Sequence, residues 1–330
     1  MFTCLVSGRN WIGSSLVGLF LLVVGGCAHV SSSRTPVVDV EKKDEVQAQM
    51  VENHANGVFL AWQSVHAKAA LLQAAIEAFV DTPTQEGMDL ARQRWIEAHE
   101  VYSPTEAFRF QGGPIDGSDG PEGLINGWPL DEAYVDYVVD SPDAGIVNDT
   151  EQFAELSSAL LESLNEAGGE ENIATGWHAI EFLLWGQDLD PEGPGNRLVD
   201  DYLVEKTPSA TRRGQYLRLT ASMLVEHIAG LVDQWKPDNT ENYRAGFVAD
   251  PQEATRLILT GMGMLAGDEL AGERMAVAWE TRDQEDEQSC FSDTTLMDIR
   301  GNLEGVVASY TGRHGGATGV SMKDWMSSQN

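Results

Sequence analysis

The chain has 330 residues, of which 21 are basic and 52 are acidic, and its net charge at neutral pH is −31. An acidic surface of this strength repels a phosphate backbone, so the composition argues against nucleic acid as a partner. The same field concentrates cations around the protein, although it also serves solubility in a salty habitat.

The N-terminus has the pattern of a cleavable signal peptide, which we expect over residues 1–26. Its one charge is Arg9, and an apolar run from Leu16 to Val24 ends in two glycines and Cys27. The run is shorter than the ~20 apolar residues that a membrane-spanning helix needs, which favours cleavage. The string VGGC resembles a bacterial lipobox, which implies a lipid on Cys27 and a tether over residues 27–45. An ordinary signal peptide is the alternative.

The other cysteines limit the disulfide chemistry of the protein. Cys4 leaves with the signal peptide and Cys27 would carry the lipid, so Cys290 stands alone and no internal disulfide can form. The acidic residues around Cys290 raise a thiol pKa, and we interpret this cysteine as structural. Ala28 follows Cys27, and resemblance to sorted lipoproteins implies an outer-membrane anchor that faces the periplasm or the cell surface.

Helical periodicity dominates the body of the chain, residues 46–310. Apolar residues recur at helical spacing from Val46 to Phe79, and this run ends at Thr82-Pro83. A second helix is expected from Thr84 toward Tyr102. Further helices are expected over residues 131–139, 150–166, 171–186, 209–235, 251–280 and 294–310.

This pattern predicts an all-α fold. We expect two helical bundles, about 46–166 and 205–310, which share the central segment 171–186, and a C-terminal tail over 311–330. The segment between Phe108 and Pro129 is rich in glycine and proline and is expected to lack regular structure. Ordered loops of this length are usually functional.

The central segment IATGWHAIEFLLWGQD, residues 173–188, is apolar or small at almost every position except His178 and Glu181. A helix of this kind is buried on all sides. The two polar residues are three positions apart and share one face, where a buried carboxylate requires a cation or hydrogen bonds. A metal ion is one such partner. A histidine–glutamate pair that bonds only to other side chains is the alternative.

Two other segments offer further ligands for a metal. The first is YSPTEAFRFQGGPID, where the second helix breaks, and its candidates are Tyr102, Glu106, Arg109 and Asp116. The second is the glycine-rich stretch 259–276, and its candidates are Glu269, Glu273 and Arg274. Its two glutamates either point inward or form a solvated acidic edge.

The remaining polar groups receive simpler interpretations. The acidic run 284–293 lacks the glycine and the alternation of an EF-hand, so we expect a solvated loop with a helix cap at Asp293. The histidines on other predicted helices are interpreted as surface or packing residues: His54, His66, His99 and His227.

These strings together resemble the imelysin family, and in particular its iron-regulated protein A branch. The GxHxxE signature of that family appears as Gly176, His178 and Glu181. The similarity also takes in EAFRFQGGPID, GLINGWPLDEAYVDYV, LTGMGMLAGDELAGERMAVA and DEQSCFSD. The resemblance implies a two-domain helical fold with a pocket at the domain interface. It also makes Glu106 and Asp116 companions of His178 and Glu181 in a metal site.

The resemblance leaves the activity open, because members were first classed as metallopeptidases whereas relatives in iron uptake carry the domain as a metal-binding module. A zincin peptidase would show HExxH, but this chain has HAIE with no second histidine nearby. We therefore expect a protein without enzyme activity that binds iron, with zinc or calcium as alternatives, and works with iron-transport components of the envelope. The alternatives are a metal-dependent peptidase that uses Glu181, and a binding protein for an organic ligand.

Overall fold

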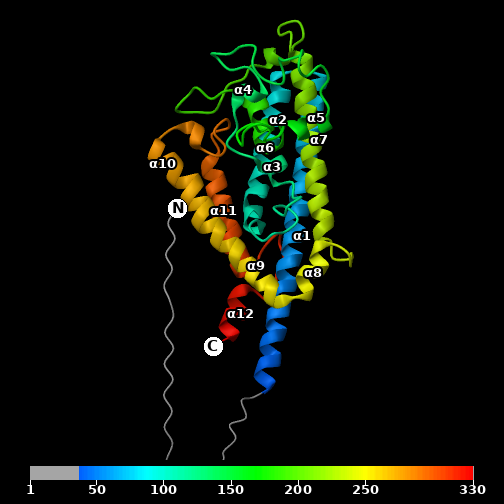
Figure 1. Cartoon of the computed structure of the whole chain (residues 1–330), viewed down its shortest axis with the longest axis vertical. Helices are drawn as coiled ribbons and strands as arrows, with labels where there is room; N and C mark the ends of the chain where they lie inside the picture. Colours follow the sequence, from blue (N-terminus) through cyan, green and yellow to red (C-terminus); the bar gives the residue numbers. More distant parts are fainter. Residues whose placement is uncertain (1–36, 330) are drawn as a thin grey trace, which may run out of the picture. The chain divides into compact units, whose positions relative to one another are not determined.

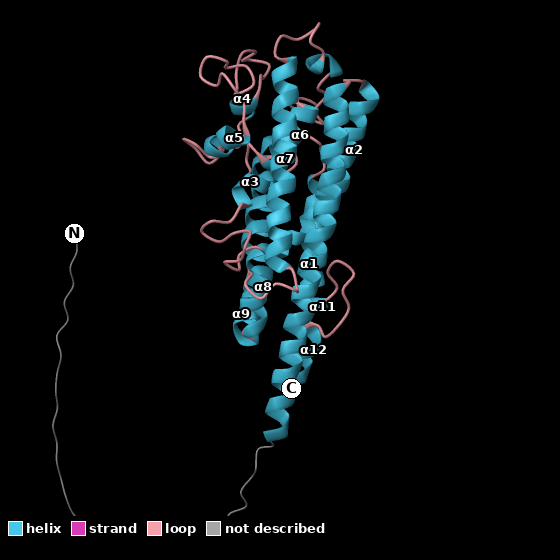
Figure 2. Cartoon of the chain, turned by 90° about the vertical axis from the view of Figure 1, so that its right-hand side faces the viewer, coloured by secondary structure: helices cyan, strands magenta, loops and turns pink. Residues whose placement is uncertain are grey.

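The computed structural model describes residues 37–329 of the chain. The expected signal peptide, the expected lipidation site Cys27 and residues 27–36 of the expected tether lie outside this range. Within residues 37–329 the chain consists of helices joined by loops and has no strand, apart from an isolated bridge between Val138 and Ser141 (Figures 1 and 2). The all-α fold expected from the sequence is confirmed.

The first two helices of the body run side by side. They are α1 (Val37–Asp81) and α2 (Gln85–Tyr102), and the Trp62 ring of α1 lies 6.2 Å from the Tyr102 ring of α2. Helix α2 begins where expected, because the Thr84 side chain accepts a hydrogen bond from a backbone N–H of its first turn. Helix α1 begins earlier than expected, so part of the segment expected as a tether is helical.

The central helix is α6 (Gly176–Trp185), and every one of its residues is buried. It packs against α2, α7 (Ala210–Trp235) and α3 (Glu122–Asn126). Gly176 has φ of +84°, and a Cβ atom there would lie 2.4 Å from the Ile125 carbonyl oxygen. Only glycine fits at this position, which fixes the start of α6 against α3.

The other helices follow in chain order: η1 (Ser103–Phe108), α4 (Glu132–Val135), α5 (Ser158–Leu164), η2 (Val199–Tyr202), α8 (Tyr243–Ala249), α9 (Pro251–Met264), η3 (Leu265–Val277), α10 (Ala278–Thr281), η4 (Gln284–Asp286), α11 (Thr295–Thr311) and α12 (Met322–Ser328). Figure 1 shows α9 and α10 as the two ends of one long ribbon. The glycine-rich segment η3 between them is π-helical. The helix expected over 251–280 is therefore present, but with a π-helical middle.

Two regions are more ordered than the sequence suggested. The glycine-rich segment after Phe108 contains α3, because the Pro121 carbonyl accepts hydrogen bonds from the N–H groups of Leu124 and Ile125. The expected C-terminal tail contains α12, which begins with a reciprocal capping box between Ser321 and Asp324.

From Val38 onward the chain forms one compact unit. The division of this unit into two bundles that share residues 171–186 stays a prediction. None of the helices within residues 37–329 is both long enough and apolar enough to cross a membrane.

Candidate functional site

The centre of the site is a histidine–glutamate pair on α6. His178 and Glu181 are both fully buried, and the Nδ1 atom of His178 lies 2.8 Å from Oε2 of Glu181. One helical turn separates the two residues, so the backbone of α6 alone brings them together.

The carboxylate of Glu181 is also held from the other end of the chain. Its Oε1 atom accepts hydrogen bonds from the backbone N–H of Ser292 at 2.8 Å and from its hydroxyl at 2.6 Å. Ser292 precedes α11, in the run that was expected to be a solvated loop. Both oxygens of Glu181 therefore have partners, which compensates the burial of the carboxylate.

The second nitrogen of His178 has no such partner. Its Nε2 atom is buried and makes no hydrogen bond. Because Glu181 accepts at Nδ1, the hydrogen-bond network assigns the proton of a neutral imidazole to Nδ1 and a lone pair to Nε2. A buried nitrogen with a free lone pair is a group that a metal ion or a hydrogen-bond donor would complete.

An aromatic cluster surrounds the pair. The His99 ring lies 5.7 Å from the His178 ring and is stacked between Trp95 and Tyr102, at 4.6 Å and 5.6 Å. Trp177 completes the cluster, and its backbone carbonyl accepts a hydrogen bond from the Trp95 indole at 2.9 Å. The Tyr102 hydroxyl is buried without a hydrogen-bond partner.

His99 forms a buried ion pair that the sequence did not reveal. Its Nδ1 atom lies 2.9 Å from Oδ1 of Asp298 on α11, whose carboxylate also accepts hydrogen bonds from Ser103 and Ser289. Burial lowers the pKa of His99, but the Asp298 carboxylate outweighs burial and raises the pKa overall. Burial likewise raises the pKa of Asp298, but the neighbouring His99 outweighs it and lowers that pKa overall. His99 thus joins α2 to Asp298 of α11 beside the site and is not only a packing residue.

Glu106 binds two arginines instead of His178. Its carboxylate is 2.8 Å from Arg109 and 2.6 Å from Arg274, and only 1% of its side chain is exposed. Burial raises the pKa of Glu106, but the two guanidinium groups outweigh burial and bring the pKa down to about 2. The carboxylate is therefore charged and committed to this ion network.

The same network takes in one of the two candidate glutamates of η3. Glu269 lies 2.7 Å from Arg274 and 3.3 Å from Arg109, whereas Glu273 is exposed on the outer side of the helix. Glu122 of α3 joins from the other side, 3.2 Å from Arg109. Glu269 is therefore the inward-pointing candidate.

Asp116 shapes the loop that follows η1. Its carboxylate accepts hydrogen bonds from the backbone N–H groups of Phe110 and Gly113. Both bonds close a tight turn within the loop, and neither involves the residues of α6. The expected cap at Asp293 is also wrong, because α11 has Thr294 as its N-terminal cap residue and Asp293 is exposed.

The four candidate ligands are thus held in three different ways. Within residues 37–329, no group of three or more His, Cys, Asp or Glu side chains is arranged to hold a metal ion. His178 and Glu181 contact each other, Glu106 binds arginines and Asp116 binds backbone. The residues present therefore fit a metal only in part, through the free Nε2 atom of His178, and the four-ligand set stays a prediction.

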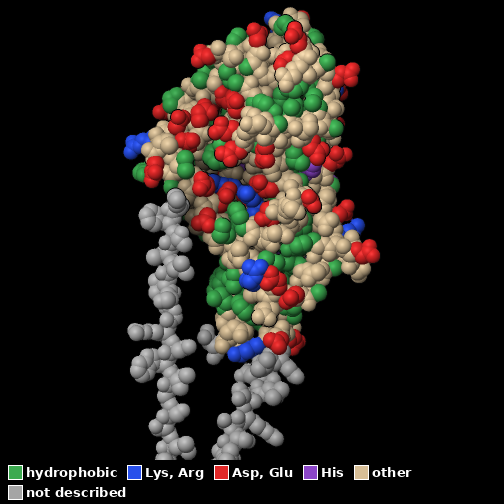
Figure 3. All heavy atoms as spheres, in the orientation of Figure 1, with side chains coloured by type: hydrophobic (Ala, Val, Ile, Leu, Met, Phe, Trp, Pro, Cys, Tyr) green, Lys and Arg blue, Asp and Glu red, His purple; other side chains and the backbone are tan. Residues whose placement is uncertain are grey.

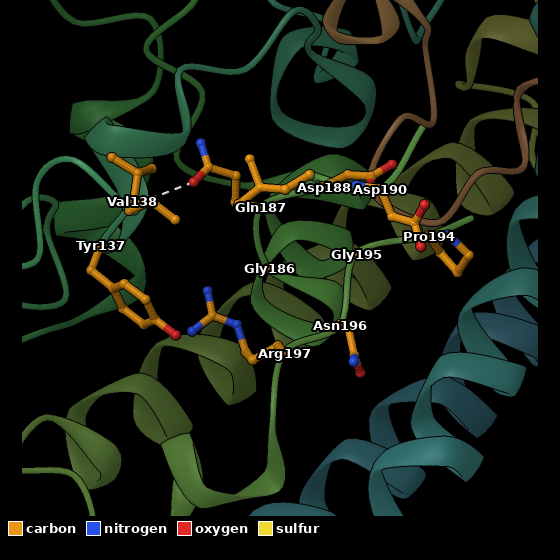
Figure 4. Close-up of a pocket in the computed structure, with 12 residues that line it drawn as sticks. Tyr137, Val138, Gly186, Gln187, Asp188, Asp190, Pro194, Gly195, Asn196 and Arg197 are labelled. Carbon is orange, nitrogen blue, oxygen red and sulfur yellow. Dashed lines mark hydrogen bonds between the residues drawn. The ribbon is translucent and has the colours of Figure 1, made fainter. Parts of the chain in front are cut away.

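A surface cavity of about 540 Å³ opens where α6 ends (Figure 4). Gln187 accepts a hydrogen bond from the Val139 N–H at 3.1 Å, and the Arg197 guanidinium lies 5.1 Å from the centre of the Tyr137 ring. Arg197 also binds the buried carboxylate of Asp136 at 2.9 Å. His178 and Glu181 do not line this cavity, so it gives no direct access to them.

Comparisons with known proteins find similarity to imelysin and to iron-regulated proteins. Residues 60–330 match the family model of imelysin. The chain is 26% identical over 281 residues to iron-regulated protein A of Synechococcus elongatus, a match that covers 82% of this chain and 66% of the relative. It thus spans slightly less than two thirds of the length of that relative.

A solved structure shares the fold. It is a crystal structure assigned to an iron-regulated protein A precursor from Parabacteroides distasonis, which superposes with a TM-score of 0.63 at 16% sequence identity. The match covers 87% of this chain and 80% of the other. At this level of identity the similarity supports the all-α fold alone.

Proposed function

We propose that this chain, which belongs to the imelysin family, is an envelope lipoprotein that binds iron or another metal cation and takes part in iron uptake or homeostasis. The name of the Synechococcus relative, iron-regulated protein A, supports the link to iron. The proposed lipid anchor at Cys27, the outer membrane as its location and the iron-transport partners rest on the sequence pattern alone.

One observation carries the proposal for the site. The imidazole of His178 is fully buried, has one nitrogen bonded to Glu181 and presents the other without a partner. Histidines that bind metals commonly donate their second N–H to a carboxylate, which fixes the tautomer and the ring orientation. In this interpretation His178 is the ligand, and Glu181 positions it and is not itself a ligand.

The chemistry of the surrounding groups suits iron better than calcium. Calcium prefers six to eight oxygen ligands, whereas imidazole nitrogen binds iron and zinc. The peptidase alternative would use Glu181, but both oxygens of this carboxylate are already bonded, one to His178 and the other to Ser292.

Calorimetric titration of the purified protein with ferrous iron, under anaerobic conditions, tests the proposal. Replacing His178 with alanine should abolish binding, because it removes the nitrogen with the free lone pair. Glu181→Gln should weaken binding by about 10- to 100-fold, the effect typical of a residue that orients a ligand.

His66→Ala is the matched control, because this half-buried histidine of α1 is not among the residues of the site. It should leave the affinity unchanged. Unchanged affinity in both the His178 and the Glu181 variants would reject the assignment.

A further inference from the structure

A second buried histidine beside the site is built in the same way as His178. The Nδ1 atom of His99, on α2, lies 2.9 Å from Oδ1 of Asp298, just as the Nδ1 atom of His178 lies 2.8 Å from Oε2 of Glu181. The Nε2 atoms of both rings are buried and make no hydrogen bond to any residue that the structure describes. Each imidazole therefore has one nitrogen beside a carboxylate and the other without a partner, as in histidines that bind metals.

The aspartate of this second pair is held as firmly as the glutamate of the first. Asp298 is fully buried, and its two oxygens accept hydrogen bonds from the hydroxyls of Ser103 at 2.9 Å and Ser289 at 2.5 Å. Glu181 is held by Ser292, which belongs to the same segment before α11 as Ser289. One segment thus secures both carboxylates, and a secured carboxylate fixes the orientation of the imidazole that it contacts.

The two imidazole rings lie at a distance that allows them to share one cation. The centres of the His99 and His178 rings are 5.7 Å apart, and their planes are inclined by 74°. Two ring nitrogens at 2.0–2.1 Å from one tetrahedral cation put the ring centres roughly 5 to 6 Å apart. The observed separation falls within this range.

Another pair of buried histidines shows that ring separation alone does not identify a metal site. His54 and His314 have ring centres 5.4 Å apart, but neither nitrogen of His54 has a partner, and Nε2 of His314 contacts the hydroxyl of Ser309. No carboxylate orients His54. The carboxylate beside each ring therefore distinguishes His99 and His178 from this second pair.

The aromatic cluster around His99 and His178 contains two more polar atoms without partners. They are the indole Nε1 of Trp177, whose ring is 5.3 Å from the His99 ring, and the hydroxyl of Tyr102, whose ring is 5.6 Å from it. Buried polar groups are nearly always hydrogen-bonded, so four unpaired atoms in one cluster require an explanation. A bound ion or water is the usual one.

We infer that Nε2 of His99 is a second nitrogen ligand of the cation proposed for His178, with Asp298 as its positioning residue. This inference rests on the proposed function and makes the site a two-histidine centre that joins α2 to α6. Two imidazoles suit a cation such as ferrous iron or zinc, whereas calcium and magnesium prefer oxygen ligands. A cation at Nε2 displaces the proton that the raised pKa of His99 retains there.

X-ray absorption spectroscopy at the iron edge, on the full chain loaded with ferrous iron, counts the imidazole ligands. The wild-type protein should show two. His99→Phe keeps a ring between Trp95 and Tyr102 but removes the nitrogens, so it should show one. Its affinity should fall by more than the roughly 10- to 100-fold that loss of an orienting carboxylate causes. Asp298→Asn should weaken binding within that range and still show two imidazoles.

His54→Phe is the matched control, because it removes a buried histidine that no carboxylate orients. It should keep two imidazoles and the wild-type affinity, and circular dichroism should show the same helix content in every variant. One imidazole in the wild-type protein, or two in His99→Phe, would overturn the second ligand and leave His178 in place. This wild-type count decides the question even if His99→Phe does not fold. A wild-type protein that binds no iron would reject the proposed function together with this inference.

Discussion

The role of each buried carboxylate in this protein depends on the residues that it is bonded to. The buried carboxylates of Glu181 and Glu106 are bonded to different types of side chain. Glu181 is held by a histidine and a serine, whereas Glu106 is held by two arginines. The first arrangement leaves the Nε2 atom of His178 free, and the second satisfies the carboxylate and serves stability.

Replacing Glu106 tests whether its ion pairs with the two arginines stabilise the fold. Glu106→Gln removes the charge that compensates Arg274, whose side chain is 3% exposed, so unfolding in urea should become easier by about 3 kcal/mol. The pKa of about 2 is below the ordinary value for glutamate, so this stabilisation is present above about pH 4.5 and is lost as the pH falls toward 2. Glu273→Gln, on the exposed face of η3, should change stability by less than about 0.5 kcal/mol. Equal effects of the two changes would contradict a structural role for Glu106.

The sequence pattern located several of the helices, but it did not show which residues of distant segments contact each other. Apolar periodicity located α1, α2, α7 and α11 because one face of each helix repeats every three to four residues. The contacts of Ser292, His99 and Asp298 with the site depend on chain segments that are far apart in sequence. A single sequence carries no information about such pairs, so these residues were missed or interpreted as solvated. The string DEQSCFSD, which contains Ser292, was the one available signal.

Packing between elements also makes the stability depend on pH. His54 of α1 is buried against Phe108, Phe247 and His314, with ring centres 5.9, 6.1 and 5.4 Å away, and both of its nitrogens lack hydrogen-bond partners. Burial lowers its pKa to about 4, and burial together with His54 lowers the pKa of His314.

A lowered histidine pKa means that the unfolded chain binds protons first as the pH falls. The contribution of His54 is therefore present above about pH 6.5 and is lost progressively toward pH 4, by about 3 kcal/mol. His54→Leu should reduce this loss when the urea midpoint is compared at pH 7 and pH 5. His66→Leu, at the half-buried histidine of the same helix, is the control, and a pH dependence equal to wild type in both variants would contradict the explanation.

At the scale of the whole molecule, the protein is an acidic unit of helices joined by loops over the residues that the structure describes. Acidic side chains are spread over the face seen in Figure 3, and basic ones are few. This surface attracts cations in general, whereas selection of one cation requires the interior site. We assign that selection to the free nitrogen of His178, because the other nitrogen of the same ring is held by Glu181.

Anomalous diffraction at the iron absorption edge, from crystals of the full chain purified without chelators and loaded with ferrous iron, tests this claim most directly. We expect one interior peak, about 2.1 Å from Nε2 of His178, with Glu181 still bonded to Nδ1 of the same ring. That peak should be absent in the His178→Ala protein. Iron found only among surface carboxylates, or an interior peak that persists without the imidazole, would show that His178 is not the ligand.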